Sequence, residues 1–74
     1  HYPPLPPDGQ STAVTDQLEA SGVSLCLYGH AHGAAGRRSF RGLKQGIQYC
    51  NVAGDQLGFR PWRLDEAAAD LPLC

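Results

Sequence analysis

One short segment near the middle of the chain constrains the fold more than any other. Residues 25–28 are Leu-Cys-Leu-Tyr, and residues 29–33 are Gly-His-Ala-His-Gly. The apolar run is typical of a buried strand, and the flanking glycines allow the backbone to turn sharply. Extended residues two apart direct their side chains to the same side, so we expect His30 and His32 to converge where the strand ends. Two converging imidazoles predict a metal site; the plainer interpretation is a pair of surface histidines in a glycine loop.

The segment before this strand has the features of a short helix. Ser11 or Thr12 can cap a helix that runs to about Ser21, with Val14 and Leu18 one turn apart on its buried side. Residues 2–8 contain four prolines, which lack backbone donors, so we expect an irregular loop there that fixes His1 beside the site.

After the helix, the pattern predicts mainly strands. Gly22 supplies a helix stop, and residues 23–28 have almost no polar alternation, which is typical of a strand buried on both faces. Residues 29–37 are expected to form a loop, and residues 39–43, 47–52 and 60–64 are short strand candidates separated by glycines. The sequence therefore predicts an α/β fold with one helix, one buried strand and a β-meander closing the edge of a sheet.

Length and charge limit the classes of function. The chain has 74 residues, which is enough for one small domain, and its net charge is −1. All six basic residues lie between positions 37 and 63, with Asp55 as the acid among them. This segment either favours phosphate-bearing ligands or is ordinary solvated charge. The chain has no basic run with interleaved aromatics, so we expect no nucleic-acid partner.

The cysteines and hydropathy suggest a cellular location. Cys26 and Cys50 lie in apolar runs and are expected to be small buried core residues. Three cysteines without paired spacing favour a reducing, cytoplasmic environment over a disulfide scaffold. No stretch reaches the roughly 18 apolar residues of a membrane span, and we expect no membrane partner.

Two motifs resemble those of a known superfamily. Residues 28–33, Tyr-Gly-His-Ala-His-Gly, resemble the Gly-His-x-His motif of the calcineurin-like metallophosphoesterases. Residues 1–4, His-Tyr-Pro-Pro, resemble the motif that precedes it, and residues 46–55 with 59–61 resemble the closing strands of a bacterial branch. The resemblance covers residues 1–64 and leaves 65–74 as a tail. It implies the C-terminal portion of a layered β-sandwich flanked by helices.

The resemblance implies a dinuclear metal site for phosphoric ester hydrolysis. By motif position, His1 and His30 would bind one divalent transition-metal ion and His32 the other; manganese, iron, zinc and nickel all suit such ligands. Arg37 and Arg38, which follow the histidine loop, are the candidate contacts for a phosphate-ester substrate.

The earlier motifs of the superfamily, Asp-x-His, Gly-Asp-x-x-Asp and Gly-Asn-His-Asp/Glu, do not occur in this sequence. We therefore expect the upstream part of a longer protein to supply the remaining ligands and the general acid or base. No catalytic residue is assigned here, and the chain alone is expected to be inactive.

Two other functions stay open at this point. Cys26, His30, His32 and Cys50 could form a small structural zinc module, or the proline segment and open strand edges could make a non-catalytic interaction fragment. Asp55 is interpreted as a turn-capping residue.

Overall fold

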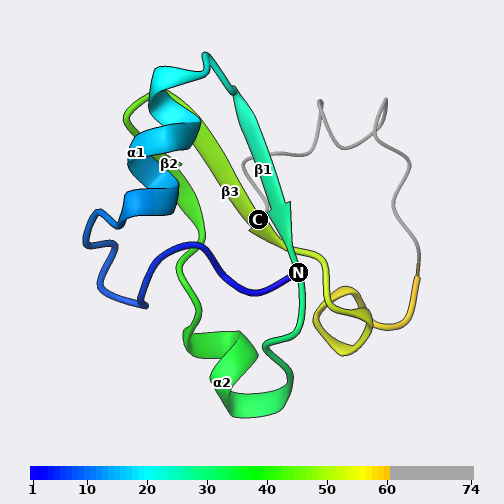
Figure 1. Cartoon of the computed structure of the whole chain (residues 1–74). Helices are drawn as coiled ribbons and strands as arrows, with labels where there is room; N and C mark the ends of the chain where they lie inside the picture. Colours follow the sequence, from blue (N-terminus) through cyan, green and yellow to red (C-terminus); the bar gives the residue numbers. More distant parts are fainter. Residues whose placement is uncertain (61–74) are drawn as a thin grey trace.

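The computed structural model describes residues 1–60, so the strand predicted at 60–64 and the tail at 65–74 lie, except for residue 60, outside the described part. The elements in chain order are α1 (Ala13–Ala20), β1 (Leu25–Tyr28), α2 (Gly33–Arg38), β2 (Gly42–Lys44), β3 (Ile47–Asn51) and a short 3₁₀-helix, η1 (Gly54–Leu57) (Figure 1). Helices and a mixed three-stranded sheet confirm the α/β class. Of the helices in residues 1–60, none is long and apolar enough to cross a membrane.

Helix α1 begins and ends where its capping residues predict. The Thr12 side chain accepts from the Thr15 backbone N–H at 3.2 Å, and Thr15 Oγ1 accepts from the Thr12 N–H at 2.8 Å, which forms a reciprocal cap. Gly22 has a φ of +74° just after the helix, as expected of a helix stop. The predicted inward position of Val14 is wrong, since it is 54 % exposed. The predicted inward position of Leu18 is confirmed, since it packs against the core, and Thr15 of the reciprocal cap is fully buried on the helix beside it.

The sheet has the order β1-β3-β2. Strand β3 lies in the centre, parallel to β1 and antiparallel to β2. Within residues 1–60 the predicted meander is a β2–β3 hairpin, and β3 lies beside β1. Burial follows the same order: three residues of β1 are only half-buried, and four of the five residues of β3 are buried. The prediction that the first strand is buried on both faces is wrong, because β1 stays partly exposed at an edge of the sheet that residues 1–60 form.

The core lies on the face of the sheet that packs against α1 and the N-terminal segment. Its buried apolar residues are Leu5, Tyr28, Ile47 and Tyr49. The Tyr28 hydroxyl donates to the Phe40 carbonyl and lies 3.0 Å from the Ser39 hydroxyl, which confirms the expected polar partner. The Tyr49 hydroxyl is buried without a hydrogen-bond partner in residues 1–60, so the same expectation is wrong for Tyr49.

The two predicted core cysteines differ in burial. Cys50 is fully buried, as expected. Cys26 is only half-buried, and burial raises the pKa of its thiol. Its position on the edge strand explains the difference.

The segment predicted as a loop at 29–37 contains helix α2. Its composition, Gly-Ala-Ala-Gly-Arg-Arg, has no apolar periodicity and two helix-weakening glycines, so the sequence gives little helical signal. Because β1 and β3 are parallel, their carboxyl ends lie at one edge of the sheet. Figure 1 shows α2 and η1 beyond that edge, with the N-terminus beside the end of β1. Residues 1–12 contain no helix or strand, as the prolines predict.

Candidate metal centre

The first histidine of the motif lies in a strained turn at the end of β1. The Ala31 N–H donates to the Gly29 carbonyl at 2.7 Å, and the residue between them, His30, has a φ of +66°. A three-residue turn with a positive φ at its centre is rare, and a non-glycine residue there is strained by about 1–3 kcal/mol. Strain of this kind is concentrated at functional sites. Gln45 and Phe59 also have a positive φ, so the strain supports His30 as a candidate only together with its ring contacts.

The N-terminal residue lies against this turn. The Gly29 N–H donates to the His1 carbonyl at 2.9 Å and so joins the proline-rich segment to the end of β1. The two imidazoles meet, with His30 Nδ1 3.2 Å from His1 Nε2 and an angle of 71° between the ring planes. Tyr2 packs on the His30 ring with centroids 4.2 Å apart. Both histidines are solvent-exposed, so their ring nitrogens are accessible.

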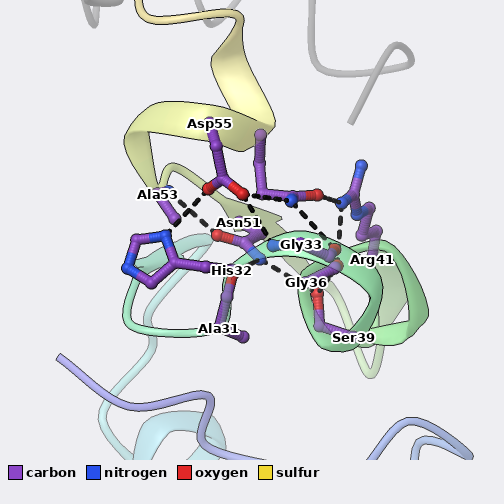
Figure 2. Close-up of polar contacts among 10 residues, drawn as sticks. Ala31, His32, Gly33, Gly36, Ser39, Arg41, Asn51, Ala53 and Asp55 are labelled. Atoms are coloured by element: carbon purple, nitrogen blue, oxygen red, sulfur yellow. Dashed lines mark hydrogen bonds and ion pairs between the residues drawn. The ribbon is translucent and has the colours of Figure 1, made fainter.

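The second histidine of the motif has a different partner. Figure 2 shows the His32 ring next to the Asp55 carboxylate, which η1 supplies. His32 Nδ1 lies 2.8 Å from Asp55 Oδ1, and the Gly33 backbone N–H donates to Oδ2 at 2.6 Å. First the Gly33 hydrogen bond and then the one from His32 lower the pKa of Asp55 from 3.8 to about 2. The interpretation of Asp55 as only a turn cap missed this contact with a predicted ligand.

A buried amide holds the loop between the two histidines. Asn51, the last residue of β3, is 4 % exposed. Its Nδ2 donates to the Ala31 carbonyl at 3.1 Å and to the Ser39 hydroxyl at 3.2 Å, while its Oδ1 accepts from the Ala53 N–H at 2.9 Å (Figure 2). Asn51 therefore connects the histidine loop to the chain that leads to Asp55. The sequence marks it only as a polar residue ending an apolar run.

The side chains of Arg41 and Gln56 connect helix α2 to η1 through hydrogen bonds. The Arg41 guanidinium donates to the Gly36 carbonyl at 2.9 Å and to Gln56 Oε1 at 2.5 Å. Gln56 Nε2 in turn donates to the Gly33 carbonyl at 3.3 Å. A side chain at Gly36 would collide with the Ala31 carbonyl and the Gln56 amide, so only glycine permits this close packing.

The predicted substrate contacts lie away from the histidines. Arg37 and Arg38 are exposed in the last turn of α2, and His32 occupies the N-cap position before its first turn. At 1.5 Å per residue, Arg38 is roughly 9 Å further along the helix axis. Neither arginine makes a hydrogen bond or ion pair within residues 1–60. A phosphate role for them therefore has no support from neighbouring groups and stays a prediction.

The spacing of the nitrogen atoms suits metal ligation. Two nitrogens that bind one tetrahedral ion at 2.0–2.1 Å lie about 3.3 Å apart, close to the 3.2 Å between His1 and His30. The same separation also suits one N–H···N hydrogen bond. Within the described part of the chain, no three His, Cys, Asp or Glu side chains form a group that could hold a metal. An ion at either place would need ligands from outside residues 1–60.

The two cysteines that a zinc module would need lie on opposite faces of the sheet. In the parallel register Cys26 is opposite Tyr49, and Cys50 is opposite Leu27. Paired residues share a face and successive residues alternate, so Cys26 and Cys50 are on opposite faces. The two cysteines cannot bind the same ion in this sheet.

Comparisons with known proteins give no relative: the chain matches no protein-family model, no curated protein and no solved structure.

Proposed function

We propose that this chain contributes the histidine ligands of a dinuclear metal site in a metal-dependent phosphoesterase of the calcineurin-like type. The observation that carries the proposal is the division of the histidines into two places. His1 and His30 meet through ring nitrogens 3.2 Å apart, whereas His32 pairs with Asp55. This division agrees with the roles that the resemblance implies, in which the first two share one ion and His32 binds the other.

The position of the histidines in the fold also supports the proposal. They follow β1 at the carboxyl edge of two parallel strands, where ligand sites of α/β sheets commonly lie. The φ of +66° at His30 is a cost to the fold that a ligand-binding role would explain. All three imidazoles are exposed, so further ligands can approach them.

Two divalent ions held there would polarise the phosphoryl oxygens of a bound ester and lower the pKa of a metal-bound water. The residues of this chain would hold the ions and orient them. The bridging carboxylate and the proton donor would come from the upstream part of the protein. On this account the substrate is a phosphate ester, and the chain alone has no hydrolytic activity.

The test is the hydrolysis of p-nitrophenyl phosphate and bis(p-nitrophenyl) phosphate by the longest protein that contains this chain, with Mn²⁺ or Zn²⁺ supplied after chelation. We expect His30→Ala and His32→Ala each to reduce turnover to the level of the chelated enzyme. The matched control is Gln17→Ala on the exposed side of α1, which should leave turnover unchanged.

Turnover by either histidine variant equal to that of the unchanged protein would refute the proposal. Activity that resists chelation in all variants would refute it as well.

A further inference from the structure

Among the three histidines, His32 differs in having a carboxylate partner within residues 1–60. Asp55 Oδ1 lies 2.8 Å from His32 Nδ1. The other oxygen, Oδ2, accepts from the Gly33 N–H at 2.6 Å and from Gln56 Nε2 at 3.2 Å. Three hydrogen bonds therefore fix the carboxylate while it faces the imidazole.

This contact determines which ring nitrogen carries the proton. An ionised carboxylate has only acceptor atoms, so the hydrogen bond requires a proton on His32 Nδ1. In the neutral imidazole the other nitrogen, Nε2, then has a free lone pair. Figure 2 shows this second nitrogen pointing away from the residues drawn, and the His32 side chain is 64 % exposed. In the neutral ring, Nε2 is therefore both unprotonated and accessible.

A histidine that ligates a metal through one nitrogen generally donates its other N–H to a carboxylate, carbonyl or water, which fixes the ring and raises its basicity. Asp55 lies 23 positions after His32 in the sequence, so local sequence motifs do not reveal this partner. Asp55 lies beside His32 because β3 runs parallel to β1, so that η1, which follows β3, lies at the same edge of the sheet as the histidine loop.

We propose that Asp55 is a positioning residue that holds His32 as the Nδ1–H tautomer and presents Nε2 as the metal-binding atom. The metal half of this statement rests on the proposed function. The tautomer half does not, since it follows from the hydrogen bond between His32 Nδ1 and the Asp55 carboxylate.

The experiment is a long-range ¹H–¹⁵N correlation spectrum of the metal-free protein with ¹⁵N-labelled histidine, recorded above the imidazole titration. We expect His32 to show a protonated Nδ1 and an unprotonated Nε2. In Asp55→Ala the ring should change to the tautomer mixture of a free histidine, while the His30 signals stay unchanged. Titration with Zn²⁺ should then shift His32 Nε2, and the affinity for Zn²⁺ should fall about 10- to 100-fold in Asp55→Ala.

Gln56→Ala is the matched structural control, because it removes a side chain that contacts Asp55 and Arg41 but retains the carboxylate. It should preserve the His32 tautomer even if it weakens the packing of η1. A His32 tautomer that is the same in Asp55→Ala and in the unchanged protein would overturn the inference, as would an Nε2–H tautomer in the unchanged protein. A tautomer that depends on Asp55 together with no response of His32 to Zn²⁺ would support the positioning role and count against the proposed function.

Discussion

Replacing Asn51 by alanine should destabilise the fold more than any other single amide truncation in β3. The substitution leaves the Ala53 N–H, in a residue that is 5 % exposed, without its acceptor at 2.9 Å. A buried donor without a partner costs about 1–3 kcal/mol. The Ala31 carbonyl also loses its donor, but it is half-buried and water can replace part of that bond, at about 0.5–1.5 kcal/mol.

Together these losses predict a decrease of about 1.5–4.5 kcal/mol in the free energy of unfolding. A chain of 74 residues has a total stability of roughly 4–11 kcal/mol, so the effect would be a large part of the whole. The assay is urea unfolding followed by far-ultraviolet circular dichroism, with a check that the slope m is unchanged.

The matched control is Gln48→Ala in the same strand, whose half-buried amide makes no side-chain hydrogen bond within residues 1–60. Its effect should stay within about 0.5–1 kcal/mol. If Asn51→Ala destabilised the protein no more than Gln48→Ala, the role of Asn51 in holding the histidine loop would be refuted.

Three further predictions follow from the same edge of the sheet. Because the pKa of Asp55 is lowered from 3.8 to about 2, its ionised form stabilises the fold above about pH 4, and this contribution is lost as the pH falls through about 2. In Asp55→Asn the free energy of unfolding should therefore fall less steeply with pH between about 4 and 2, as measured by acid unfolding. His30→Gly should have a free energy of unfolding about 1 kcal/mol higher than His30→Ala, because glycine accepts a φ of +66° without strain. Both variants should lose Zn²⁺ binding, as measured by calorimetry. Equal stability of the two would show that the turn is not strained. Gly36→Ala should lower the free energy of unfolding by about 1–3 kcal/mol, because the added methyl group would collide with the Ala31 carbonyl. The control, Ala35→Gly on the exposed side of α2, should lower it by about 1 kcal/mol or less in the same thermal or urea unfolding experiment.

Local chemistry made several elements predictable from the sequence. Thr12 begins α1 and Gly22 follows its end, since capping and positive φ depend on single residues. The strand before the histidines was also predictable, because an apolar run ending in glycine is a local signal. The inward face of α1 was predictable only in part: Leu18 packs against the core, whereas Val14 is exposed and Thr15 of the reciprocal cap is buried.

The candidate site was predictable only in its histidines. The partnership of His32 with Asp55 depends on the parallel pairing of β1 with β3, and no residue near either strand specifies that pairing. Helix α2 was missed because it depends on tertiary contacts, above all those of Arg41 and Gln56, rather than on helix propensity.

The central claim is that the three histidines bind two metal ions, and metal content tests it most directly. The protein should be isolated without added metal, with its intact mass and any copurifying polypeptide determined alongside elemental analysis. We predict close to two transition-metal ions per assembly, with His32→Ala losing one of them and His30→Ala the other. An unchanged metal content in both variants, or a complete assembly that takes up no metal when it is supplied, would contradict the account.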